Sequence, residues 1–92
     1  MSIIEEIYKT ITERKMHPKE GSYTNYLLSK GIDKTLKKVG EETSEIIIAA
    51  KNCSKEEITY EIADLIYHLS VLMVQTGVCW DDVFKELAQR KK

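Results

Sequence analysis

The sequence is 92 residues long, and 42% of its residues are hydrophobic while 32% are charged, which is typical of one folded domain and excludes a disordered chain. Its formal net charge of −1 excludes the basic field by which proteins attract nucleic acid. We therefore expect a single domain over residues 1–92 that has no nucleic-acid partner.

The N-terminal segment predicts an amphipathic helix from about Ser2 to Arg14, because its isoleucines recur at three- and four-residue steps. Acidic residues interrupt this apolar face, so we expect neither a signal peptide nor a membrane anchor. Residues 17–22 contain the only proline and a glycine, which predicts a loop. Ser22 can then cap a short helix that stops at Gly31.

Three more helices complete the predicted fold. A long third helix is expected over residues 33–52. Ser54 and Glu57 have capping-box spacing and begin a fourth helix, which runs to Thr76. A last helix opens at Asp81 or a neighbour. Because no segment alternates apolar and polar residues as a strand would, the predicted fold is an all-α bundle of about five helices.

Cysteine usage and size indicate the cellular compartment and the oligomeric state of the protein. Cys53 and Cys79 lie far apart and outside any CxxC motif, which disfavours a zinc site or a disulfide framework and fits a reducing compartment. Together with the absence of a signal peptide, this predicts a cytoplasmic protein without a membrane partner. The fourth helix is apolar around nearly its whole circumference, so we expect it to be buried on most sides, and the small core predicts a bundle completed by homodimerisation.

The predicted third helix separates charged from apolar residues. At about 100° per residue, one sector holds Lys34, Lys38, Glu41, Glu42 and Glu45. The opposite sector holds a stripe that we expect to face the core, formed by Ile32, Leu36, Val39, Thr43, Ile46 and Ala50. Taken alone, the charged sector is most simply explained as a solvated face with weak ion pairs.

Two carboxylates of the fourth helix change this interpretation. Glu61 and Asp64 lie one turn apart on a helix that is expected to be buried, where ionised carboxylates need a proton or a cation. The short connection between the helices should pack them antiparallel, within reach of Glu42 and Glu45. Four oxygen donors favour Mg²⁺, with Mn²⁺ as a substitute, over zinc. No Glu-x-x-His element supports a di-iron site, and His68 is expected to be a hydrogen-bonded histidine rather than a ligand.

Phosphate chemistry follows from this predicted metal site. Magnesium that is held by carboxylates usually keeps water and is completed by substrate phosphates. Lys34 and Lys38 lie on the same face of the third helix and can hold the remaining phosphate groups. The expected partner is therefore a small nucleotide substrate.

The order and spacing of the acids resemble those of the all-α nucleoside triphosphate pyrophosphohydrolase superfamily, with Glu-Glu-x-x-Glu at residues 41–45 and Glu-x-x-Asp at residues 61–64. Within it, EGSYTNYLLSKGIDKTLKKVGEETSEIIIAAKN and EIADLIYHLSVLM are similar to the phosphoribosyl-ATP pyrophosphatases of histidine biosynthesis. The resemblance runs over nearly the whole chain. It implies hydrolysis of phosphoribosyl-ATP to phosphoribosyl-AMP and pyrophosphate, the second step of that pathway.

The resemblance also implies roles for individual residues. The catalytic acids would be Glu41, Glu42 and Glu45, with Glu41 orienting the site or helping to activate water. The Mg²⁺ ligands would be Glu42, Glu45, Glu61 and Asp64. The segment near the substrate would comprise Ser22, Tyr23 and Thr24, although helix capping explains Ser22 equally well.

The family that the chain resembles is dimeric, which agrees with the apolar fourth helix. Some of its members are fused to a cyclohydrolase domain, which we do not expect in a chain of 92 residues. Two alternatives stay open. One is a house-cleaning pyrophosphohydrolase of the same superfamily that acts on non-standard nucleotides, and the other is a non-catalytic helical dimerisation module whose acids form salt bridges.

Overall fold

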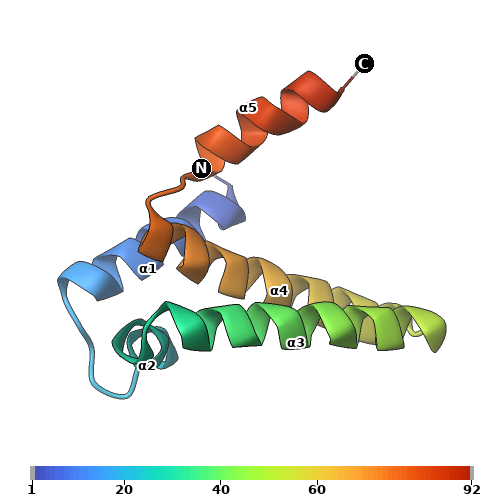
Figure 1. The fold of residues 1–92 in the computed structure, drawn as a ribbon, viewed down its shortest axis with the longest axis horizontal. Helices are drawn as coiled ribbons and strands as arrows, with labels where there is room; N and C mark the ends of the chain where they lie inside the picture. Colours follow the sequence, from blue (N-terminus) through green and yellow to red (C-terminus); the bar gives the residue numbers. More distant parts are fainter. Residues whose placement is uncertain (1, 92) are drawn as a thin grey trace.

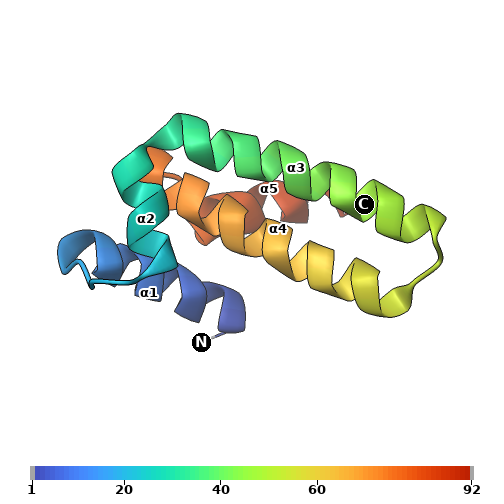
Figure 2. The same ribbon diagram turned by 90° about the horizontal axis from the view of Figure 1, so that it is seen from below.

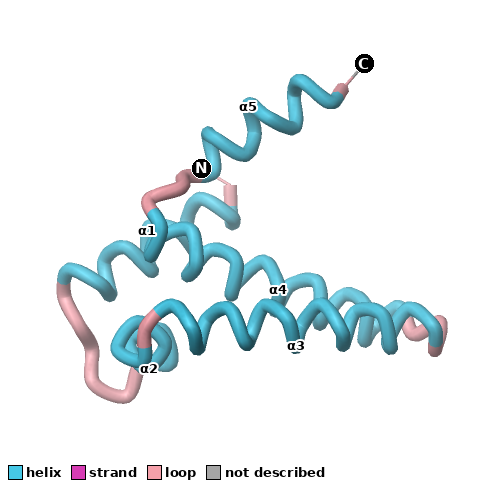
Figure 3. Tube along the Cα trace, in the orientation of Figure 1, coloured by secondary structure: helices cyan, strands magenta, loops and turns pink. Residues whose placement is uncertain are grey.

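The computed structural model describes residues 2–91, which form five α-helices and, within that range, no strand (Figures 1 and 3). The helices are α1 (Ile3–Met16), α2 (Tyr23–Lys30), α3 (Ile32–Lys51), α4 (Lys55–Thr76) and α5 (Trp80–Arg90). The predicted all-α class and the number of helices are confirmed, whereas homodimerisation stays a prediction.

Local capping chemistry fixes most of the helix ends where the sequence predicts them. The hydroxyl oxygen of Ser22 accepts a hydrogen bond from the backbone N–H of Asn25 at 3.2 Å, and Ser54 does the same for Glu57 at 3.2 Å. Gly77 ends α4 in the left-handed conformation, with φ of 81°. These caps set the lengths of the helices that carry the predicted site.

The long helices α3 and α4 lie side by side and run antiparallel, as the short connection between them predicts (Figures 1 and 2). At the end of the α3–α4 pair away from this connection, α1 and α2 pack against the C-terminal half of α4. The hydrophobic core lies where these three helices meet and centres on Ile11, Leu27, Val71 and Val74. The N-terminal half of α4 is therefore left to contact α3 alone.

The apolar stripe of α3 does not face the core of its own chain, so this prediction is wrong. Ile32 and Leu36 are 42% and 47% exposed, and the stripe residues Thr43 and Ala50 are exposed as well. Periodicity locates an apolar face but does not say which neighbour covers it. Among the described helices the only long neighbour of α3 is α4, and the face turned toward α4 is the one that carries Glu42.

Burial of α4 is also less complete than its composition predicts. The residues buried on this helix lie from His68 to Val74, where α1 and α2 cover it. Near its start, Tyr60 and Ile62 are exposed. The expectation of burial on most sides is thus correct only for the second half of the helix within one chain.

The last helix, α5, projects away from the other four (Figure 1). Its apolar residues Phe84 and Leu87 are exposed, and Trp80 stacks on Phe84 with ring centroids 5.8 Å apart. The backbone N–H of Cys79 donates to the Asp82 carboxylate at 3.0 Å, so α5 begins one residue earlier than Asp81. Among the described helices, none is long and apolar enough to cross a membrane by itself; α4 and α5 meet such criteria only as a pair bent by 114°.

Candidate active site

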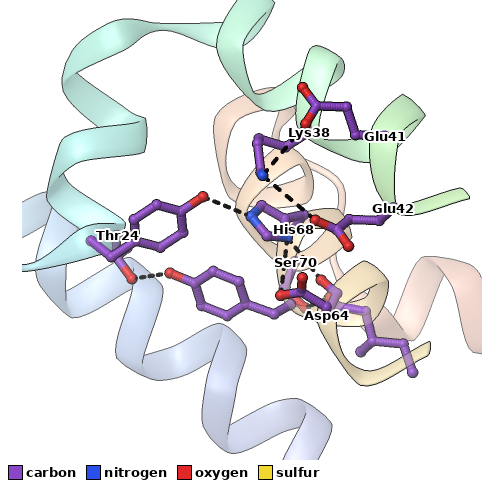
Figure 4. Close-up of polar contacts among 10 residues, drawn as sticks. Thr24, Lys38, Glu41, Glu42, Asp64, His68 and Ser70 are labelled. Atoms are coloured by element: carbon purple, nitrogen blue, oxygen red, sulfur yellow. Dashed lines mark hydrogen bonds and ion pairs between the residues drawn. The ribbon is translucent and has the colours of Figure 1, made fainter. Parts of the chain in front are cut away.

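Carboxylates from α3 and α4 converge between the two helices (Figure 4). Ligand oxygens of Glu42, Glu45 and Glu61 lie within 4.8 Å of one another. A second group, with ligand atoms equally close, consists of Glu42, Asp64 and His68. The structure therefore brings together all four acids that were expected to bind a metal, and Glu42 belongs to both groups.

Glu42 is the most unusual acid of the chain, because its side chain is only 2% exposed. Burial is the largest of the causes that raise its pKa from 4.5 to about 8, and the nearby carboxylates of Asp64 and Glu45 act in the same direction. Its Oε2 atom is buried without a hydrogen-bond partner among the described residues, as is Oε2 of Glu61. Buried polar atoms normally have a hydrogen-bond partner, so these two oxygens are available to a ligand.

Glu45 and Glu61 shift each other's pKa. A carboxyl–carboxylate contact with Glu45 raises the pKa of Glu61, with burial acting in the same direction. The same contact lowers the pKa of Glu45. Of the two acids, Glu61 is therefore the one that takes up a proton first as the pH falls. Acids in this arrangement either share protons or bind a cation.

The donor set fits a hard divalent cation. Four carboxylates offer oxygen ligands, two of their buried oxygens have no protein partner, and no cysteine contributes. Magnesium needs only one or two carboxylates besides water and substrate oxygens. These four residues can therefore hold such an ion and still leave coordination positions for a ligand.

Lys38 is the cation at the edge of this cluster. Its Nζ atom lies 3.6 Å from Oε1 of Glu42 and 3.7 Å from Oε2 of Glu41. Burial opposes the charge of Lys38, but the Tyr23 phenol and the two carboxylates outweigh it, so the lysine pKa is raised. Lys38 therefore stays cationic beside the acids.

Glu41 and Lys34 lie outside both groups of ligand atoms. The Glu41 side chain is 45% exposed and belongs to neither group of ligand atoms. The Lys34 ammonium lies over the ring of Tyr26, 6.0 Å from its centroid, where Lys30 also lies at 5.8 Å. Both residues border the site and do not form part of its cluster.

The start of α2 is attached to α4 next to the acids. The Tyr23 hydroxyl lies 3.0 Å from Nε2 of His68, and the Thr24 hydroxyl is hydrogen-bonded to the hydroxyl of Tyr67. The other ring nitrogen of His68, Nδ1, lies 2.8 Å from the backbone oxygen of Asp64. His68 is thus a buried, hydrogen-bonded histidine, as predicted.

At this end of the site one residue was predicted from the sequence and another was not. The capping role of Ser22 is confirmed, since its hydroxyl oxygen is used by the Asn25 N–H. Sequence reasoning missed Tyr67, which stacks near Tyr23 with centroids 6.1 Å apart. The available signal was its place directly before His68, one turn after Asp64 on the helix that carries the acids.

Comparison with known families agrees with this geometry. The model of the phosphoribosyl-ATP pyrophosphohydrolase family matches residues 4–91. The chain belongs to this family. The resemblance of its acidic motifs is thereby confirmed at the level of the family.

Relatives of two kinds share this sequence. The chain is 56% identical over 91 residues to a phosphoribosyl-ATP pyrophosphatase of Lactiplantibacillus plantarum. The matched region covers 99% of the chain and 86% of the relative. It is 63% identical over 84 residues to the histidine biosynthesis bifunctional protein HisIE of Thermoanaerobacter pseudethanolicus, covering 91% of the chain and 39% of that protein. The HisIE of Caldanaerobacter subterraneus is 55% identical over 92 residues, and the chain covers 45% of it. The chain thus spans less than half the length of these bifunctional relatives.

Proposed function

We propose that this protein hydrolyses phosphoribosyl-ATP to phosphoribosyl-AMP and pyrophosphate, and that it does so in the cytoplasm as a step of histidine biosynthesis. Family membership supports the substrate. The observation that carries the chemistry is the buried Glu42, which joins carboxylates from two helices and has an oxygen with no protein partner. A chain that needed only stability would not keep such a group in its interior.

Mg²⁺, or Mn²⁺ in its place, would be held by Glu42, Glu45, Glu61 and Asp64. Bound at these oxygens, the ion would supply charge neutralisation at the phosphoryl oxygens and a water of lowered pKa. The protein contributes the shape of the site, because the packed helices α3 and α4 bring their carboxylates together. In this role Glu42 and Glu45 are catalytic residues through the ion that they would bind.

The lysines of α3 would hold the phosphates. Lys38 lies beside Glu42 at 3.6 Å and stays cationic, so it can exchange this ion pair for a phosphate oxygen when substrate enters. Glu41 contacts the same ammonium from the exposed side and would orient it or the attacking water. Lys34, whose ammonium lies over the ring of Tyr26, would bind a more distant phosphate of the substrate. Ser22, Tyr23 and Thr24 would line the site from α2.

A second copy of the chain is the proposed protein partner. The exposed stripe of α3, with Ile32 and Leu36, and the exposed apolar residues of α5 are surfaces that a homodimer would cover. The short single-chain core, which lies at one end of the α3–α4 pair, also supports this proposal.

The direct test is an assay of the purified protein with phosphoribosyl-ATP, with pyrophosphate release measured in the presence of Mg²⁺ and again with excess chelator. We expect turnover that stops with the chelator and returns with added Mg²⁺. Asp64→Asn should lose turnover while its circular dichroism spectrum is retained, and Glu13→Gln on the exposed face of α1 provides the matched control. Faster hydrolysis of a free noncanonical triphosphate such as inosine triphosphate would contradict the proposed substrate. Turnover that is insensitive to chelator would contradict the metal.

A further inference from the structure

His68 is only 2% exposed, and each of its ring nitrogens lies within hydrogen-bonding distance of one partner. Nδ1 lies 2.8 Å from the backbone oxygen of Asp64, and Nε2 lies 3.0 Å from the hydroxyl of Tyr23. Figure 4 shows the His68 ring next to the side chains of Glu42 and Asp64, with which it forms one of the two groups of ligand atoms. The direction of each bond follows from the chemistry of the two partners.

A backbone carbonyl can only accept a hydrogen bond, so Nδ1 of His68 must carry the proton that it donates to Asp64. A neutral imidazole has one such proton, which leaves Nε2 with a lone pair. The Tyr23 hydroxyl must then be the donor to Nε2. The backbone of α4 thus decides which way the phenol proton points.

With its proton directed to His68, the oxygen of Tyr23 can only accept any further hydrogen bond. Tyr23 is 46% exposed, so this oxygen belongs to a side chain that a ligand can reach. The charges of Lys38, Asp64 and Glu42 all act on the phenol, although burial is the largest influence and raises its pKa. Tyr23 therefore lies at the margin of the carboxylate cluster with an acceptor to offer.

The donor that meets this acceptor cannot be a phosphate, since phosphate oxygens at neutral pH are acceptors themselves. The donors that a nucleotide carries are its sugar hydroxyls and, on some bases, an exocyclic amino group. The sugar is the group joined to the phosphates, and Tyr23 lies beside the carboxylates that would hold those phosphates through the ion. We propose that His68 is a positioning residue that fixes the Tyr23 oxygen as an acceptor for a ribose hydroxyl of the substrate. This inference rests on the proposed function, because it takes the ligand at the carboxylates to be a nucleotide.

The bond directions can be measured without any substrate. In ¹⁵N-labelled protein with His17→Gln, His68 is the only histidine, and the ring-nitrogen shifts at pH 8 report which nitrogen is protonated. We expect a protonated Nδ1 and an unprotonated Nε2. A proton on Nε2, alone or together with one on Nδ1, would overturn the proposal, whether or not the protein hydrolyses phosphoribosyl-ATP.

The sugar contact is tested by Tyr23→Phe, which removes only the hydroxyl. A lost neutral hydrogen bond weakens binding by roughly three- to tenfold, so KM for phosphoribosyl-ATP should rise by this factor while kcat changes by less than about twofold. The dissociation constants of AMP and of ribose 5-phosphate, measured by calorimetry with Mg²⁺, should rise equally, whereas that of inorganic pyrophosphate should not change. An equal loss for pyrophosphate, or a loss for AMP that ribose 5-phosphate does not share, would contradict a sugar contact.

Tyr67→Phe is the matched control, because it removes the other hydroxyl that joins α2 to α4. It should leave KM and AMP binding within about twofold of wild type. If it weakened AMP as much as Tyr23→Phe does, the Tyr23 hydroxyl would serve only to dock α2, and the proposal would fail.

Two substitutions separate positioning by His68 from simple packing. In His68→Gln the amide oxygen can still accept from Tyr23, so KM should stay near that of wild type. His68→Leu should reproduce the rise in KM seen with Tyr23→Phe, and the double variant should be no worse than either single one. Additive losses would show that His68 does not act through Tyr23. If His68→Leu fails to fold, the comparison of His68→Gln with Tyr23→Phe decides the same question.

A wild type that binds AMP but does not hydrolyse phosphoribosyl-ATP would reject the proposed function alone.

Discussion

The two faces of α3 differ in burial in an unexpected way, because the polar face is buried and the apolar face is exposed. Toward α4 the helix presents Glu42, which is 2% exposed, while on the other side Leu36 is 47% exposed. In an ordinary amphipathic helix the leucine would be inside and the acid in water. Neither placement stabilises the single chain, so each face must serve something outside it.

The two faces serve different ligands. The acidic face carries the buried Glu42, and together with Glu61 of α4 it offers two carboxylate oxygens without a protein partner, which suits a cation and the phosphates that it would bind. The exposed apolar face has no covering element in the described part of the chain, which suits a second copy. Changes to one face should therefore affect catalysis, and changes to the other should affect assembly.

The largest effect is expected from Glu42→Gln, which keeps the shape of the buried side chain and removes its charge. Since Glu42 belongs to both groups of ligand atoms, we expect kcat/KM for phosphoribosyl-ATP to fall by at least about 100-fold, a loss of roughly 3 kcal/mol in transition-state stabilisation. Mg²⁺ affinity, measured by calorimetry, should fall with it. Turnover near the wild-type rate would show that the buried acid is not part of the metal site.

The next effect concerns the apolar face. Leu36→Asp places a carboxylate in the middle of the exposed stripe, and burying it in a dimer would carry a large desolvation cost. We expect the wild type to sediment with twice the mass of one chain and the variant with the mass of one chain. Lys37→Asp, on the side of α3 away from the stripe, should leave the mass unchanged. A monomeric wild type would mean that another partner covers the stripe.

Most of the fold could be predicted because its signals are local. Ser22 and Ser54 begin helices through their own hydroxyl groups, and Gly77 ends one through its backbone conformation. The meeting of the four acids was also predictable, since a short connection forces α3 and α4 to run antiparallel. These inferences need only residues that are close together in the sequence.

The rest of the site depends on contacts between distant segments. Tyr23 and His68 are 45 residues apart and meet only because the loop before α2 directs that helix across α4. The covering of the α3 stripe depends on which element packs beside it, and a helical wheel contains no such information. Local patterns therefore predicted which residues share a face but not what that face contacts.

The pH dependence of stability distinguishes the two faces without any substrate. The pKa of Glu42 is raised from 4.5 to about 8 in the folded chain, so between these values the native state holds a proton that the unfolded chain has lost. The free energy of unfolding without metal should therefore decrease as pH rises through this window, by on the order of 2–4 kcal/mol. Urea denaturation with chelator at pH 5, 7 and 8.5 measures it. The decrease of the unfolding free energy with pH should be smaller in Glu42→Gln, and added Mg²⁺ should offset it in the wild type. Leu36→Asp should show the same decrease as the wild type.

The smallest effect is expected at Glu41, which precedes Glu42 in the sequence but is exposed where Glu42 is buried. Its side chain is 45% exposed and its one ion pair, to Lys38 at 3.7 Å, lies in solvent, so Glu41→Gln should change the free energy of unfolding by less than about 0.5 kcal/mol. Its stability should follow the same pH curve as the wild type. Activity should fall less than in Glu42→Gln, because Glu41 can act only on Lys38 or on water. A loss of stability or of Mg²⁺ affinity that equals the loss in Glu42→Gln would mean that Glu41 turns inward when the ion binds, and that the acidic face of α3 is wider than this structure shows.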